Sequence, residues 1–153
     1  MAKINICGAK CHIFDIASGK GFMDLWERYY GDADAVIFCW KLFDANRNEE
    51  QRQILEMVRR EIPDDVPILI FGHVYENDNT GMSCSSLPSM STEAFLPNYH
   101  SNVMQVICGS AKNGKGVREA MEWFVPLAKR QAKSRAAQQE QLLVAAASSL
   151  EGR

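Results

Sequence analysis

Continuous apolar runs in the middle of the chain restrict its fold more than any other feature of the sequence. The runs 35–40 and 67–71 have no alternating polar positions, and each is short enough for one strand. Such runs are typical of strands buried on both faces of a parallel sheet. A further strand is predicted at 102–108, so the sheet is expected to be mostly parallel.

Amphipathic segments surround these strands. In the segment 22–30 apolar side chains recur at i, i+3, i+4 and i+7, which predicts a short helix. A second helix is predicted at 48–62, where a proline ends it. A third is predicted from 117 to about 132, and Pro126 is expected to bend it or to weaken its order.

The chain begins with two strand-like stretches, 3–8 and 11–15, around a hairpin turn predicted at Gly8-Ala9-Lys10. The segment 72–101, rich in Ser, Asn, Pro and Met, is expected to be a long loop with at most one short helix. A hairpin followed by alternating helices and parallel strands gives an α/β layered domain.

We expect this single domain to span 1–132. The remaining tail, 133–153, has high helix propensity but only one apolar patch, Leu142-Leu143-Val144. The tail is therefore predicted to be either a helical extension or disordered.

Composition argues against several classes of partner. The 153 residues carry a net charge of −2, which gives no overall basic field for nucleic acid or an anionic membrane. We find no apolar run of membrane-spanning length, no signal peptide, no Gly at position 2 for myristoylation and no prenylation cysteine. We expect no direct membrane anchor and a cytoplasmic location, with membranes reached only through partners.

The five cysteines are odd in number and scattered, which favours a reducing compartment over a disulfide framework. Cys7 and Cys11 with His12 resemble part of a metal site, but no second CxxC and no HxxxH accompany them, so no zinc is expected. A nucleophilic role for Cys11 or Cys108 has no partner visible in the sequence.

The loop that follows the last predicted strand has two interpretations. Gly109–Lys115 matches the first seven positions of the phosphate-binding motif GxxxxGK[ST], but Gly116 stands where a hydroxyl should reach Mg²⁺. Alternatively, Ser110, Ala111 and Lys112 form a base-recognition loop of the small-GTPase kind, or the loop only connects strand to helix.

The neighbouring sequence favours the GTPase interpretation. Residues 110–124 resemble the last loop and helix of Arf-like and Rab-like GTPases. Residues 14–19 lie where that family has its DxxGG segment, and 25–30 reads Leu-Trp-Glu-Arg-Tyr-Tyr, as in the Arf-type switch II. The chain therefore resembles an Arf/Arl-like small GTPase of the Ras-like P-loop superfamily from the hairpin to Arg130.

This resemblance implies a degenerate nucleotide site that would hold GTP or GDP with Mg²⁺. Asp15 matches the aspartate that holds Mg²⁺ through water, Ser18 replaces the glycine that meets the γ-phosphate, and Gly19 replaces the catalytic glutamine. His73 and Glu76 begin and end the segment that matches the guanine-specific NKxD. Ser110, Ala111 and Lys112 are expected to face the base, with a backbone amide on the guanine ring oxygen.

The resemblance also implies missing parts. Family members carry a P-loop, its strand and switch I before or beside the hairpin, and the sequence begins at the hairpin. That strand lies centrally in the family's sheet, so its loss is expected to expose two apolar edges. Direct re-pairing of the sheet, a strand supplied by a partner chain, and an incomplete gene model are the three alternatives.

Two functions follow from the resemblance. The first is an Arf-like GTP-binding regulator of intracellular trafficking with impaired or absent hydrolysis. The second is a pseudo-GTPase that binds no nucleotide and presents Trp26, Tyr29 and Tyr30 to protein effectors or regulators. The competing assignment for these three aromatic residues is the hydrophobic core.

Overall fold

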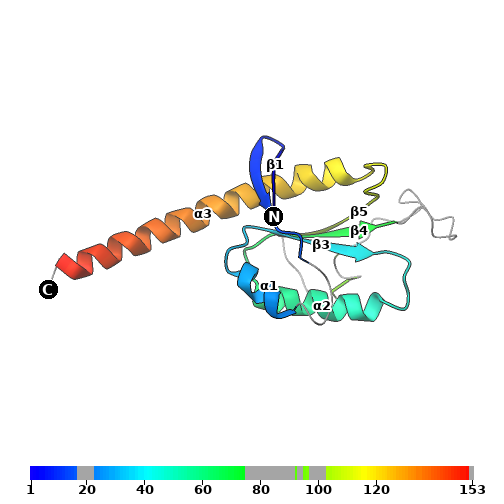
Figure 1. The fold of residues 1–153 in the computed structure, drawn as a ribbon, viewed down its shortest axis with the longest axis horizontal. Helices are drawn as coiled ribbons and strands as arrows, with labels where there is room; N and C mark the ends of the chain where they lie inside the picture. The colour runs from blue at the N-terminus through cyan, green and yellow to red at the C-terminus, as the bar shows by residue number, and fades with distance from the viewer. Residues whose placement is uncertain (17–22, 75–91, 93–94, 97–102, 152–153) are drawn as a thin grey trace.

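The computed structural model describes residues 1–16, 23–74, 92, 95–96 and 103–151. Along the chain the elements are β1 (Ala2–Ile6), β2 (Ala9–Ile13), α1 (Met23–Tyr30), β3 (Val36–Lys41), α2 (Asn48–Glu61), β4 (Ile68–His73), β5 (Met104–Gly109) and α3 (Val117–Glu151) (Figure 1). The predicted α/β class, a hairpin followed by helices and parallel strands, is confirmed and is consistent with an incomplete Ras-like fold.

Strands β3, β4 and β5 form one parallel sheet with β4 in the centre. Helix α2 lies on one side of this sheet and α3 on the other (Figure 1). This arrangement explains the run 67–71, because a strand between two helical layers buries both of its faces. For the run 35–40 the same prediction is wrong: β3 lies at the edge of the described parallel sheet, and its Ile37 and Cys39 are exposed. The whole of Ile68–Phe71 is buried.

The core has two parts, one on each face of the sheet. On the α2 face, Leu55 and Val58 pack with Ile68 and Ile70 of β4. On the α3 face, alternate strand residues meet the third helix: Leu69, Phe71 and Ile107 pack with Ala120 and Phe124. The alternation follows from the two-residue period of a strand, and it fixes the register of the sheet against the helices.

The hairpin turn differs from its prediction by one residue. The turn consists of Cys7 and Gly8, both at positive φ (49° and 69°), while Ala9 already belongs to β2. A two-residue hairpin loop with positive φ at both positions matches the right-handed twist of the strands. The glycine is therefore the second turn residue, and the prediction had placed it first.

The hairpin and the parallel sheet are separate sheets among the described residues. The alternative in which the sheet re-pairs directly is therefore wrong. Among the described strands, β3 lies at an edge of the parallel sheet, and Val36 and Leu42 direct their N–H groups to the β4 side. By alternation, the backbone groups of Ile37 and Cys39 point to the open edge. At the end of β3, the Gln51 side chain bonds both backbone groups of Lys41, at 2.7 and 3.2 Å.

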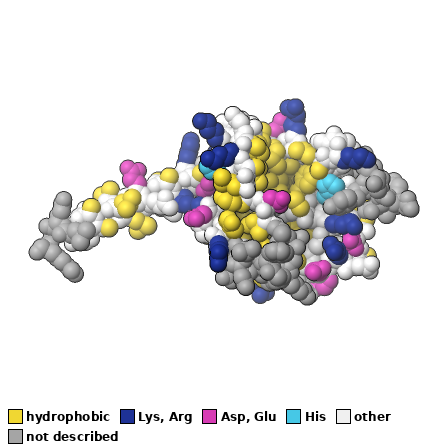
Figure 2. Space-filling model, viewed as in Figure 1, with side chains coloured by type: hydrophobic (Ala, Val, Ile, Leu, Met, Phe, Trp, Pro, Cys, Tyr) yellow, Lys and Arg dark blue, Asp and Glu magenta, His cyan; other side chains and the backbone are white. Residues whose placement is uncertain are grey.

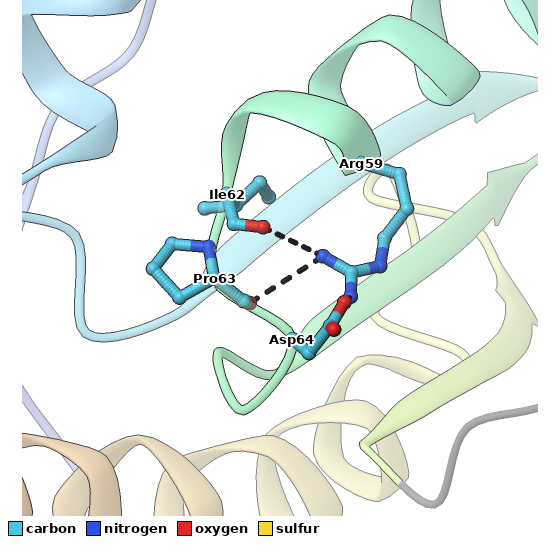
Figure 3. Close-up of polar contacts among 4 residues, drawn as sticks. All are labelled: Arg59, Ile62, Pro63 and Asp64. Carbon is cyan, nitrogen blue, oxygen red and sulfur yellow. Dashed lines mark hydrogen bonds and ion pairs between the residues drawn. The ribbon is translucent and has the colours of Figure 1, made fainter.

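Helix α2 ends in a cap formed by its own Arg59. This buried guanidinium donates to the carbonyl oxygens of Ile62, at 2.8 Å, and Pro63, and it pairs with Asp64 (Figure 3). Ile62 is the C-cap residue and Pro63 follows it, so the guanidinium satisfies carbonyls where the chain leaves the helix, and its charge complements the helix dipole at this end.

Helix α3 continues past Pro126 to Glu151, so the expected weakening of helical order at this proline does not occur. Pro126 is exposed, and its ring lies on the solvent side of the helix. Of the two alternatives for the tail, the structure shows the helical extension. In the described part of the chain, no helix has the length and apolar character needed to cross a bilayer.

Candidate functional site

The carboxyl ends of β4 and β5 meet beside the start of α3. His73 ends β4 and Gly109 ends β5, and these two residues are partners in the parallel register. In open α/β sheets this edge is the usual place for a ligand. It is also where the sequence predicts the base-recognition residues, so the structure brings His73, Ser110, Ala111 and Lys112 into one region.

The central contact of this region joins His73 to Ala111. The backbone N–H of Ala111 donates to Nε2 of His73 at 3.2 Å. The imidazole lies 6.5 Å from the ring of Phe71, measured between centroids. One of the three backbone amides from which the resemblance expects a contact to the guanine ring oxygen, that of Ala111, is thus bonded inside the chain.

The rest of the loop 110–116 is closed on itself. The N–H of Ser110 donates to the Lys115 carbonyl at 3.0 Å, that of Gly114 to the Ser110 carbonyl at 2.9 Å, and that of Lys115 to the Asn113 side chain at 2.9 Å. A phosphate cradle needs several backbone N–H groups pointing at the anion. The phosphate-loop interpretation is therefore wrong for this loop as it is folded.

Gly116 is required by packing. Its φ is +73°, and a Cβ built on it would lie 2.3 Å from the carbonyl oxygen of Cys108. No other residue fits this close approach between the loop and β5. The same loop buries Ser110, whose side-chain oxygen has no hydrogen-bond partner among the described residues.

Asp15, the predicted Mg²⁺ residue, lies beside β3. Its charge acts on Cys39, whose pKa is raised first by partial burial of the thiol and second by this carboxylate. Among the residues that the structure describes, no three His, Cys, Asp or Glu side chains form a metal-binding group.

The three predicted partner-binding aromatics have different environments. Trp26 is 7% exposed and belongs to the α2-side core, so the core assignment describes this residue. Tyr30 is half-buried against the same core. Tyr29 is 38% exposed, and its ring centroid lies 5.1 Å from that of Phe14. Tyr29 alone of the three offers a substantial exposed surface.

Two predicted site residues, Ser18 and Glu76, lie outside the described residues, as does Gly19. The contact that sequence reasoning missed is the bond between His73 and Ala111. These residues are 38 positions apart, and neither has a local pattern that indicates the other. The only signal was their placement after adjacent parallel strands.

Comparison with known proteins identifies the family. The family model described as "ADP-ribosylation factor family" matches residues 1–127. The chain belongs to the Arf family. Three relatives show how much of the chain is similar and at what identity. ADP-ribosylation factor-related protein 1 of Bos taurus is 30% identical over 127 residues, covering 80% of this chain and 60% of the relative.

The other two relatives are more distant. ADP-ribosylation factor-like protein 3 of Chlamydomonas reinhardtii is 27% identical over 119 residues, covering 77% of this chain and 65% of the relative. ADP-ribosylation factor-like protein 1 of Saccharomyces cerevisiae is 25% identical over 121 residues, covering 78% and 64%. This Arf-family chain thus spans less than two thirds of the length of these relatives, and its match to the family model ends within α3.

Proposed function

We propose that this chain is an Arf-like regulator of intracellular trafficking with impaired or absent GTP hydrolysis. The observation that carries the proposal is the match of residues 1–127 to the Arf family, and the bond from the Ala111 N–H to His73 Nε2 limits how tightly a guanine base can bind. A guanine oxygen that took this amide would have to displace the imidazole. The base would then gain one hydrogen bond only by breaking another, which reduces the net benefit of binding.

The sequence supports the loss of hydrolysis separately. Gly19 stands at the position of the glutamine that orients the attacking water in the family's GTPases. A glycine has no side chain for this task. If GTP binds, we therefore expect it to persist unhydrolysed.

The alternative is a pseudo-GTPase that binds no nucleotide and works through protein contacts in the cytoplasm, reaching membranes through its partners. The exposed ring of Tyr29 and the open edge of β3 favour this alternative. The backbone groups of Ile37 and Cys39 at that edge are suited to pair with a strand from an effector or regulator.

A titration with fluorescent GDP and GTP, with and without Mg²⁺, separates the two. Binding at micromolar or tighter concentration that requires Mg²⁺, with no release of phosphate over hours, supports the first function. Absence of binding, beside an Arf-family GTPase that binds under the same conditions, supports the pseudo-GTPase. Hydrolysis by this chain as fast as that of the Arf-family GTPase would contradict both.

A further inference from the structure

The second half of α3 leaves the body of the protein. All residues from 136 to 149 are exposed, and Figure 1 shows this part of the helix projecting away from the sheet. It lies beyond the residues that match the Arf family, 1–127, so the family assigns it no role. A helix without tertiary contacts is marginal in water, and most helices in proteins are stabilised by packing of an apolar face.

Contacts just before the projection fix its direction. Arg135 donates to the carbonyl oxygen of Ala33 and pairs with Asp34 at 3.2 Å, and Gln131 donates to Asp65 at 3.0 Å. These bonds tie the helix to the loops that precede β3 and β4. Because the helix then continues without a break, the segment 136–149 extends beyond the body and does not fold back on it.

The projecting segment has a stripe of uncharged residues in which three of the four are apolar. The polar Gln139 and the apolar Leu142, Leu143 and Ala146 recur at i, i+3, i+4 and i+7, which places them on one side of the helix. Leu142 and Leu143 are 70% and 72% exposed, and Figure 2 shows hydrophobic side chains on the surface of the projecting helix. Between 136 and 149 the only charged residue is Glu140, whereas the solvent face of a helix is normally rich in charge.

We propose that this stripe pairs with the same stripe of a second copy of the chain, in an antiparallel two-helix contact. A nearly neutral surface can pair with itself without like-charge repulsion, and a two-fold contact uses one patch on both copies. The absence of Lys and Arg from 136–149 argues against an anionic membrane surface as the occupant.

The body of the protein determines the antiparallel direction. Gln139 follows Met121 by 18 residues, which is five helical turns, so both point to the same side of α3. Met121 is packed against the core of the body. In a parallel pair the two bodies would therefore occupy the same space, whereas antiparallel helices carry the bodies at opposite ends.

The contact pairs Leu142 with Leu143 of the other copy, and Gln139 with Ala146. Its area is small because only about four helical turns meet, so the dimer is expected to be weak, with dissociation at roughly tens to hundreds of micromolar. This association is independent of nucleotide, and its failure would leave the proposed function untouched.

Sedimentation velocity of the full chain over a wide concentration range, with reductant to prevent disulfides, tests the proposal. We expect a monomer–dimer equilibrium that Leu143→Asp weakens by roughly tenfold or more. Gln141→Asp is the matched control, because it adds the same charge on the opposite side of the helix and should leave the equilibrium unchanged. Circular dichroism of each variant confirms that the fold is retained.

The direction is tested by Ala147→Lys. Glu140 and Ala147 lie two turns apart on the same flank, and antiparallel packing brings the same flank of both helices together. The new lysine should therefore lie near Glu140 of the other copy and tighten the dimer roughly twofold. The proposal that the stripe forms the dimer contact is wrong if the chain stays monomeric at all concentrations. It is also wrong if the dimer persists in Leu143→Asp but is lost in Ile37→Asp. A dimer that Leu143→Asp dissociates and Ala147→Lys does not tighten overturns the antiparallel arrangement.

Discussion

Ala111 donates its backbone N–H to Nε2 of His73 across 3.2 Å, and this bond ties the loop after β5 to the end of β4. Replacing His73 by Ala removes the acceptor. We expect faster hydrogen exchange at the Ala111 amide and a loss of about 1 kcal/mol in the free energy of unfolding.

Exchange of the Ala111 amide measured by NMR, together with urea denaturation, tests this expectation. His12→Ala is the matched control, because His12 is an exposed histidine on the hairpin. Unchanged exchange at Ala111 in the His73 variant would show that the bond does not hold the loop.

Arg59 supplies a second test, because it caps α2 from a buried position. Arg59→Ala leaves the carbonyls of Ile62 and Pro63 without their donor, and we expect a loss of about 2 kcal/mol in the free energy of unfolding. Asp64→Asn should cost less, since Asp64 is almost fully exposed and solvent screens the ion pair.

Urea denaturation of these variants measures both effects. Arg60→Ala is the matched control, because it removes an arginine side chain that is exposed and leaves the Arg59 cap in place. If Asp64→Asn proved as costly as Arg59→Ala, the ion pair and not the carbonyl cap would hold the end of α2.

The order of elements could be predicted because each apolar pattern has a local cause. The apolar runs indicated β3 and β4, but only β4 is buried on both faces, because β3 lies at the edge of the described parallel sheet and exposes Ile37 and Cys39. The i, i+3, i+4 pattern indicated α1 and α2 to within one or two residues. The predicted hairpin turn differs from the observed one by one residue, because Cys7 adopts a positive φ that is uncommon for a residue other than glycine.

Long-range pairing could not be predicted in the same way. The sequence left open whether the hairpin joins the parallel sheet, and in the structure the two are separate. Such pairing depends on backbone geometry between distant segments, so no local pattern indicates it. Likewise, the composition of the tail allowed either a helix or disorder. The site region was predicted from the resemblance, but the engagement of Ala111 by His73 depends on the loop conformation, which no motif encodes.

Cys39 reports on the position of Asp15. Burial and the Asp15 carboxylate raise the pKa of the Cys39 thiol, so the thiolate is scarcer than in a free cysteine at the same pH. Asp15→Asn removes the smaller of the two causes, and we expect alkylation of Cys39 by iodoacetamide at pH 8 to accelerate roughly twofold. Peptide mass spectrometry follows the rate at this cysteine alone.

The raised pKa also fixes the sign of a stability effect. The folded protein holds the Cys39 proton more tightly than the unfolded chain, so this contribution to the free energy of unfolding is complete below the ordinary pKa of a thiol and is lost as pH rises through the raised value.

Glu50→Gln, which neutralises an exposed carboxylate on α2, is the control for the alkylation experiment. Equal acceleration in both variants would exclude a specific effect of Asp15.

Trp26 and Tyr29 lie three residues apart on α1 but differ in burial. Trp26 is packed in the α2-side core, so Trp26→Ala should lower the free energy of unfolding by about 3–5 kcal/mol through a large cavity. Tyr29 makes its ring contact with Phe14 while partly exposed, and Tyr29→Ala should cost only about 1 kcal/mol. Thermal or urea denaturation measures both values. If Trp26→Ala lowered the free energy of unfolding only slightly, α1 would not be packed as the structure shows, and Trp26 would be accessible to partners.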